Sequence, residues 1–78
     1  MSLTLTEAKI RLLEELEGNP KHGYILAKDL GVRGSTIYEH VSQLDEHGYI
    51  KSEKNGRRRV YSLTRKGELI LEAERTDE

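Results

Sequence analysis

The sequence predicts a mostly helical α+β domain: three helices, then a β-hairpin, then a fourth helix, in one folded unit covering residues 1–78. Three observations support this order. Apolar residues recur at helical spacing in three segments before residue 48. An Asn-Gly pair at residues 55–56 then joins two segments rich in β-forming residues. A threonine-capped helical segment follows the second of them.

The first helix is expected at about residues 5–17. Thr4 and Glu7 have the spacing of a capping box, in which each side chain satisfies a free backbone N–H at the helix start. The apolar stripe of this helix consists of Leu5, Ala8, Leu12, Leu13 and Leu16. Gly18 and Pro20 then end the helix, because glycine favours the terminating conformation and proline cannot continue it.

The second helix is expected at about residues 22–30, with Gly31 placed to end it. Its predicted buried side chains are Ile25, Leu26 and Leu30. The link to the next helix, residues 29–36, is short and contains two glycines. Such a link is typical of a helix-turn-helix.

The third helix is expected at about residues 35–47, closed by Gly48. Thr36 and Glu39 again have the spacing of a capping box. The inward face is predicted to consist of Ile37, Val41 and Leu44, which recur at i, i+4 and i+7.

Residues 49–63 are expected to form the hairpin. Asn55-Gly56 is the preferred pair for a tight type I′ turn, because both residues tolerate positive φ. The strands around it contain Tyr49, Ile50, Val60, Tyr61 and Leu63. The fourth helix, at about residues 65–75, is capped by Thr64. A hairpin directly after a helix-turn-helix makes the predicted fold a winged helix-turn-helix.

The formal net charge of −1 hides two strongly charged segments. Residues 51–66 contain seven basic residues and one acid, a net charge of +6. Residues 68–78 contain five acids and one base, a net charge of −4. Because a local field attracts a polyanion more than the total charge does, the hairpin is predicted to face a negatively charged partner.

Other functions lack the residues they need. The chain has no cysteine, which excludes disulfides, thiolate metal sites and a cysteine nucleophile. His40 and His47 lie about 10 Å apart along a helix, too far to share one metal ion, and His22 has no partner pattern. We therefore expect no metal, no cofactor and no enzymatic activity. The apolar runs are too short for a membrane span or a signal peptide, so a cytoplasmic location is expected.

The outer face of the third helix carries small polar side chains that suit base edges in the major groove of DNA. At the helix start, backbone N–H groups also favour a phosphate. Tyr38 can donate to a phosphate or pack against a sugar. Glu39 can accept from cytosine or serve only as a cap, and a solvated polar face is the alternative for the whole set. The candidate DNA contacts here are Arg33, Ser35, Thr36, Tyr38, Glu39, His40, Ser42 and Gln43.

The hairpin tip supplies the candidate contacts to the minor groove and the backbone. Arg57 lies nearest the turn and is expected to insert deepest. Arg59 lies closest to the core and can instead pack its stem over Tyr61 or pair with Glu53. A solvated or localisation role is the alternative for such a basic run. The candidate contacts of the hairpin are Lys54, Asn55, Arg57, Arg58 and Arg59.

Residues 20–67 resemble the PadR-like winged-helix transcription regulators and, more loosely, the MarR and ArsR groups. The matching pieces are His22-Gly23-Tyr24, Thr36-Ile37-Tyr38, Leu44 through Ile50, and the ending Tyr61-x-Leu63-Thr64-x-x-Gly67. The resemblance implies a homodimeric repressor in the prokaryotic cytoplasm that binds a palindromic operator in double-stranded DNA. The chain ends without a long C-terminal helical region and lacks the ArsR cysteines, so a minimal repressor of archaeal or viral type without a small-molecule effector is expected.

Two points stay open at this level. The first and last helices offer a dimer interface, but the same residues can complete the core of one chain. The candidate interface residues are Leu5, Leu12, Leu69, Ile70 and Ala73. A winged helix can also serve as a protein–protein interaction module, in which case the hairpin arginines would contact an acidic protein surface.

Overall fold

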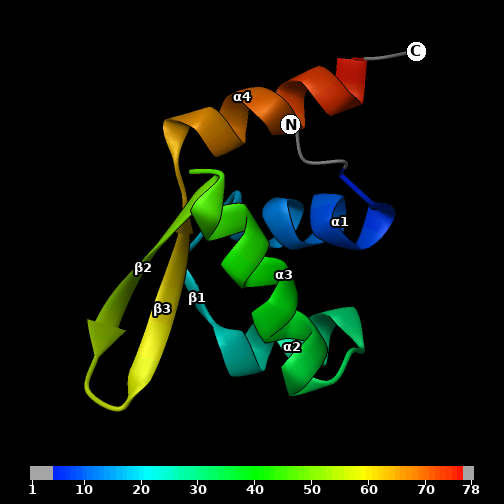
Figure 1. Cartoon of the computed structure of the whole chain (residues 1–78). Helices are drawn as coiled ribbons and strands as arrows, with labels where there is room; N and C mark the ends of the chain where they lie inside the picture. The colour runs from blue at the N-terminus through cyan, green and yellow to red at the C-terminus, as the bar shows by residue number, and fades with distance from the viewer. Residues whose placement is uncertain (1–4, 77–78) are drawn as a thin grey trace.

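The computed structural model describes residues 5–76, which form four helices and a small antiparallel sheet (Figure 1). The elements are α1 (Glu7–Leu16), β1 (Lys21–His22), α2 (Gly23–Leu30), α3 (Gly34–Glu46), β2 (Ile50–Asn55), β3 (Arg58–Leu63) and α4 (Arg65–Thr76). The predicted winged helix-turn-helix is confirmed. No helix in this part of the chain has the length and apolar character needed to cross a membrane.

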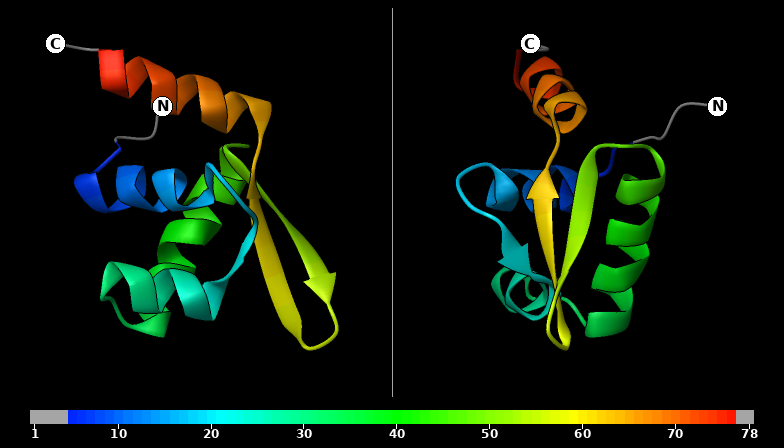
Figure 2. Two further views of the ribbon diagram at one scale, coloured as in Figure 1. Left: turned by 180° about the vertical axis from the view of Figure 1, so that it is seen from behind. Right: turned by 90° about the vertical axis from the view of Figure 1, so that its left-hand side faces the viewer.

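The helices and the hairpin are arranged so that the two ends of the molecule differ. The β2–β3 hairpin points away from α4, and α1 lies beneath α4 (Figures 1 and 2). Helix α2 and the start of α3 lie toward the other end of the molecule, on the side of the hairpin tip, and α3 runs from there toward α4. The hairpin and the helix-turn-helix therefore share one end of the molecule.

The sheet has a third strand that was not predicted. Its strand order is β1-β3-β2, and β1 places Lys21 opposite Tyr61 and His22 opposite Val60. A two-residue strand is too short to show the alternation by which strands are recognised, so only its pairing with β3 defines it. This pairing ties the start of α2 to the base of the hairpin.

The core lies between α1, α2, α3 and one face of the sheet. Its buried apolar residues are Leu12, Leu13, Leu16, Leu26, Ala27, Ile37, Val41, Leu44, Ile50, Tyr61 and Leu71. The predicted inward face of α3 is confirmed. The prediction for Ile25 is wrong: this side chain is 37% exposed, and Ala27 is buried in its place. Because β1 fixes where α2 begins, it also fixes which side of this short helix faces the core.

The predicted capping residues of α1 and α3 are wrong, although both helices begin within two residues of the predicted starts. Thr6 caps α1 by accepting from the Lys9 N–H at 3.4 Å, whereas the predicted cap, Thr4, lies outside the described residues. In α3 the N-cap is Arg33, with no capping bond from its side chain. Thr36 lies inside the first turn, so the capping box with Glu39 does not form.

The predicted ends of α2 and α3 and the predicted cap of α4 are confirmed. Gly31, which ends α2, has φ of 68°, and Gly48, which follows α3, has φ of 78°. Both values lie in the left-handed region that glycine adopts without strain. Thr64 caps α4 by accepting from the Gly67 N–H at 3.1 Å.

The hairpin turn differs from the prediction by one residue. Asn55 pairs with Arg58, so the two turn residues are Gly56 and Arg57. Gly56 has φ of 65°, and no described residue other than glycine has positive φ. Glycine at the first turn position is the pattern of a type II′ turn, not the predicted type I′. The register of the paired strands, anchored by buried Tyr61 opposite Ser52, draws Asn55 into the strand.

Candidate nucleic-acid interface

Helix α3 presents its polar side at the end of the molecule that carries the hairpin tip. Ser35, Tyr38, Glu39 and Ser42 are exposed on this side, opposite the buried stripe of α3. Arg33 is also exposed, at the N-terminal end of the helix. These residues form the outer strip that a DNA groove could reach.

Three other predicted contacts on α3 lie to one side of that strip. Thr36, His40 and Gln43 are half-buried. The Nδ1 atom of His40 is buried and has no hydrogen-bond partner among the described residues. Helical spacing places these three on the flank opposite Tyr38, which lies toward the hairpin. The predicted set therefore divides into an exposed strip and a partly covered flank.

The three arginines at the hairpin tip occupy three different environments. Cross-strand partners share a face of the sheet, so Arg59 and Lys54 lie on the face that carries Tyr61. Arg58 and Asn55 lie on the opposite face. Arg57 lies in the turn and belongs to neither strand. The tip therefore presents positive charge in several directions.

Arg59 is partly tied to the protein, as expected, but through a different partner. Its Nη1 donates to Ser52 Oγ at 3.4 Å. The expected pairing with Glu53 is wrong, because Glu53 lies opposite Val60 on the other face of the hairpin. Burial raises the pKa of the Tyr61 hydroxyl, and the nearby Arg59 charge opposes this shift. Arg59 therefore lies on the same face as Tyr61, and its bond to Ser52 makes it less available than Arg57 or Arg58.

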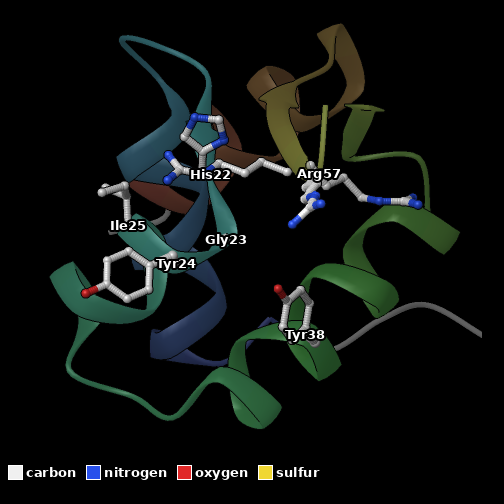
Figure 3. Close-up of a pocket in the computed structure, with 8 residues that line it drawn as sticks. His22, Gly23, Tyr24, Ile25, Tyr38 and Arg57 are labelled. Carbon is white, nitrogen blue, oxygen red and sulfur yellow. The ribbon is translucent and has the colours of Figure 1, made fainter. Parts of the chain in front are cut away.

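A groove of about 510 Å³ separates the hairpin from the helix-turn-helix (Figure 3). The arginines at positions 57–59 form one wall, and Tyr38 of α3 directs its hydroxyl into the space. The other wall is the start of α2, with His22, Tyr24 and Ile25. None of the residues that line this groove is acidic. The groove can therefore accept an anionic ridge between two basic or polar walls.

A glycine allows the two helices to approach at the base of this groove. Gly23 is buried, and a Cβ atom there would lie 3.4 Å from Tyr61 Cε2 and 3.6 Å from Tyr38 Cε1. A larger side chain would push against Tyr38. A Cβ atom alone would make ordinary van der Waals contact with both rings, so Gly23 lies close to Tyr38 and Tyr61 at the base of the groove.

Residues on the α2 side of the groove were missed as candidates. Tyr24 is 75% exposed, and the misassigned Ile25 lies beside it. The sequence did contain a signal, because Tyr24 and Ile25 are large side chains at the start of a helix. In the structure, β1 holds that helix start close to the hairpin. That closeness depends on the pairing of β1 with β3, which no local pattern indicates.

Residues 12–73 of the chain match the Transcriptional regulator PadR-like family. The chain belongs to the PadR-like family of transcriptional regulators. The match covers most of the chain and extends beyond residues 20–67, on which the resemblance rested. Members of this family are regulators of transcription and not enzymes. No curated protein sequence matches the chain.

Solved structures of other regulators have the same fold as this PadR-like chain. A probable transcriptional regulator from Pseudomonas aeruginosa is 30% identical, with a TM-score of 0.83 over 88% of this chain and 55% of that one. The regulator Tm0710 from Thermotoga maritima is 31% identical, with a TM-score of 0.81 over 86% and 50%. Lactococcus lactis ZitR in complex with DNA is 22% identical, with a TM-score of 0.83 over 96% and 53%. The chain thus spans about half the length of these structures.

The segments that carried the resemblance to the PadR-like family occupy three places in the fold. Leu44 through Ile50 forms the end of α3 and the start of β2, with Leu44 and Ile50 in the core. His22-Gly23-Tyr24 and Tyr38 line the groove beside the hairpin. The ending from Tyr61 to Gly67 forms the last strand and the cap of α4. The family pattern therefore contains both surface residues at the groove and residues that join elements of the fold.

The candidate dimer residues of this PadR-like chain differ in how far they are exposed. Leu69 is 50% exposed on α4, Ala73 is exposed, and Leu5 and Ile70 are half-buried. Leu12 is completely buried within a single chain. Its assignment to a dimer interface is wrong, because it completes the core, as the alternative reading of these residues allowed.

Proposed function

We propose that this chain binds double-stranded DNA sequence-specifically and represses transcription as a homodimer on a palindromic operator. Helix α3 would lie in the major groove, and the hairpin would follow the minor groove and the backbone. The site would be nucleoid DNA in the prokaryotic cytoplasm. Membership of a family of transcriptional regulators makes DNA the expected partner.

The observation that carries the proposal is the groove between α3 and the hairpin. Two elements that enter adjacent DNA grooves must have a sugar-phosphate ridge between them. Here the space between them is lined by the three tip arginines and by the hydroxyl of Tyr38, with no acid in its lining. On this proposal the ridge occupies the groove, and Tyr24 and His22 contact it in addition to the residues predicted from the sequence.

The test begins with selection of binding sites from a random duplex pool, followed by salt titration of the affinity. Arg58→Ala should weaken binding to all sequences and lower the salt slope by about 0.9, the value for one lost phosphate contact. Arg65→Ala is the matched control, because Arg65 is 80% exposed at the start of α4, away from the hairpin tip. Its slope should equal that of the wild type.

Sequence choice is tested separately from affinity. Ser35→Ala should change which bases are preferred at one or two positions of the selected site, because base contacts carry specificity. Gln43→Ala tests the half-buried flank of α3 in the same way. Uniform weakening would remove either residue from the base-reading set. A wild-type protein that binds no duplex at low salt would contradict DNA binding and favour a protein partner.

A further inference from the structure

The C-terminal end of α3 is joined to the start of α4 by a cluster of contacts remote from the hairpin tip. The cluster consists of residues 47–49, which follow α3, and residues 64–67, which begin α4. We call these seven residues the α3–α4 brace. The brace contains the last part of the family pattern, from Thr64 to Gly67, which has no place in the DNA surface described above.

Three hydrogen bonds run from the α4 side of the brace to backbone carbonyls on the α3 side. Thr64 Oγ1 donates to Gly48 O at 2.6 Å, and the Thr64 N–H donates to Tyr49 O at 3.1 Å. Lys66 Nζ donates to His47 O at 2.8 Å. Carbonyls at the end of a helix lack partners within the helix, and a cation there is favoured by the helix dipole. Lys66 therefore satisfies the carbonyl of His47, the C-cap of α3, and Thr64 binds the carbonyls of the two residues that follow it.

Packing makes the same junction close-fitting. The Lys66 ammonium lies 5.2 Å from the centre of the Tyr49 ring, and the Tyr49 ring stacks on His47 with centres 6.0 Å apart. A Cβ atom at Gly67 would lie 2.0 Å from Tyr49 O, so only glycine fits there. Lys66 thus contacts both His47 and Tyr49. Gly67 lets the backbone of α4 lie directly against the backbone of Tyr49, the residue before β2.

We propose that Lys66 is a positioning residue, which fixes the orientation of α3 relative to α4 and so sets the half-site spacing that the dimer accepts. The inference rests on the proposed function, with α4 in the dimer interface and α3 in the major groove. Helix α3 has 13 residues and is about 20 Å long. A tilt of about 10° at the brace would move its far end by about 3.5 Å, close to the rise of one base pair.

Contacts outside the brace hold the two helices in different ways. The N-terminal end of α3 has no side-chain cap, so its backbone is not fixed there by such a bond. Helix α4 is separately fixed to α1 by Arg75, which pairs with Glu14 and Glu17. The core also joins the two helices, because Leu71 of α4 lies in the same buried cluster as the inward face of α3. The brace adds the polar contacts between the end of α3 and the start of α4. In the brace, Lys66 is the residue that places a positive charge at the end of α3, where its ammonium donates to His47 O.

The test uses the full chain and duplexes in which two selected half-sites are separated by different numbers of base pairs. Wild-type protein should prefer one spacing. Lys66→Met keeps an apolar stem over Tyr49 but removes the donor and the charge. It should reduce the preference for the best spacing over its neighbours by at least about threefold, within the range for coupling through packed contacts. Affinity for a single half-site should stay within about twofold of the wild type.

Two controls separate positioning from simple loss of charge or of fold. Lys51→Met removes one exposed charge from the outer face of β2, outside the brace, and should keep the wild-type spacing preference. Lys66→Arg can still donate to His47 O and should restore the preference. If Lys66→Met lowers affinity equally at every spacing, or leaves the preference unchanged, the positioning role is overturned.

The failure of this proposal is distinguishable from failure of the proposed function. A wild-type protein that binds single half-sites but shows no spacing preference would leave DNA binding intact and overturn the role of Lys66. A wild-type protein that binds no duplex would overturn both.

Discussion

At the scale of single residues, chemically identical side chains differ because of where the backbone places them. The three arginines at positions 57–59 are consecutive in sequence, but one lies in the turn and the other two lie on opposite faces of β3. All three are exposed, but Arg59 also donates to Ser52. We therefore expect Arg57 and Arg58 to contribute more to DNA affinity than Arg59.

The glycines also differ in the space that surrounds them, and this difference predicts how each tolerates a methyl group. Gly67→Ala places a methyl group 2.0 Å from Tyr49 O, so it should destabilise the fold by about 3 kcal/mol or more. Gly18→Ala is the matched control, because nothing lies within 4 Å of its added Cβ. It should change stability by no more than about 1 kcal/mol. Urea unfolding followed by circular dichroism measures both, and equal stabilities would contradict the close packing of α4 on Tyr49.

At the scale of elements, the structure is held by contacts that join segments distant in sequence. The pairing of β1 with β3 fixes the start of α2, and the brace fixes the start of α4. The other end of α4 is held by Arg75, which donates to Glu17 through both terminal nitrogens at 2.7 Å and to Glu14 at 3.2 Å. These groups are partly exposed, so their contribution is screened by solvent.

The Arg75 contacts predict a dependence of stability on pH. The hydrogen bond from Arg75 lowers the pKa of Glu17 below its usual value of 4.5. A lowered folded-state pKa means that the stabilisation is complete above the usual value and is lost as the pH falls through the folded value. Arg75→Ala should therefore be less stable than the wild type at neutral pH, and the difference should shrink in acid. Urea midpoints measured across this range test the effect.

The control for this prediction is a neighbouring exposed arginine. Arg11→Ala removes one charge from α1, and within residues 5–76 the side chain that pairs with Glu17 is Arg75, not Arg11. Its stability difference from the wild type should not follow the titration of Glu17. If the Arg75→Ala difference is the same at neutral and acidic pH, the ion pair does not stabilise α4 on α1.

At the scale of the whole molecule, the charge separation in the sequence becomes a separation in space. The basic hairpin tip lies at one end, and the acidic side chains of α4 lie at the other (Figure 1). A polyanion can therefore approach the hairpin without meeting the acids that balance the net charge. The exposed Leu69 on α4 lies at the acidic end, so a dimer formed there would leave the DNA surface free.

This arrangement predicts that dimer formation and folding can be separated. Leu69→Asp should leave the monomer folded, because Leu69 is 50% exposed, but it should shift dimers toward monomers in light scattering after gel filtration. Operator affinity should fall because two half-sites are no longer bound together. Glu68→Gln changes charge at the adjacent position without removing apolar surface and is the control. An unchanged mass for Leu69→Asp would place the dimer interface elsewhere.

Much of the fold could be predicted because its signals are local. The inward face of α3 follows from apolar spacing, and the ends of α2 and α3 follow from glycines that adopt positive φ. The cap of α4 follows from Thr64. In the candidate site, the basic hairpin tip and the exposed side of α3 were also predicted. The signals for these features lie within a few residues of the structure they specify.

The errors arose where a distant contact decides the local structure. The turn shifted from Asn55-Gly56 to Gly56-Arg57 because strand register, set by buried pairs, overrides the preference of the turn residues. Ile25 is exposed because β1, which has no pattern of its own, sets the start of α2.

The sequence alone determined the order of the helices and the hairpin, the family and the basic character of the hairpin, because periodicity, glycine positions and charge are properties of short segments. Only the tertiary structure decided that the start of α2 lines the groove beside the hairpin, that Leu12 belongs to the core, and that Lys66 reaches the end of α3. These features join residues that are distant in the chain, and which of them meet is determined by packing and strand pairing over the whole domain.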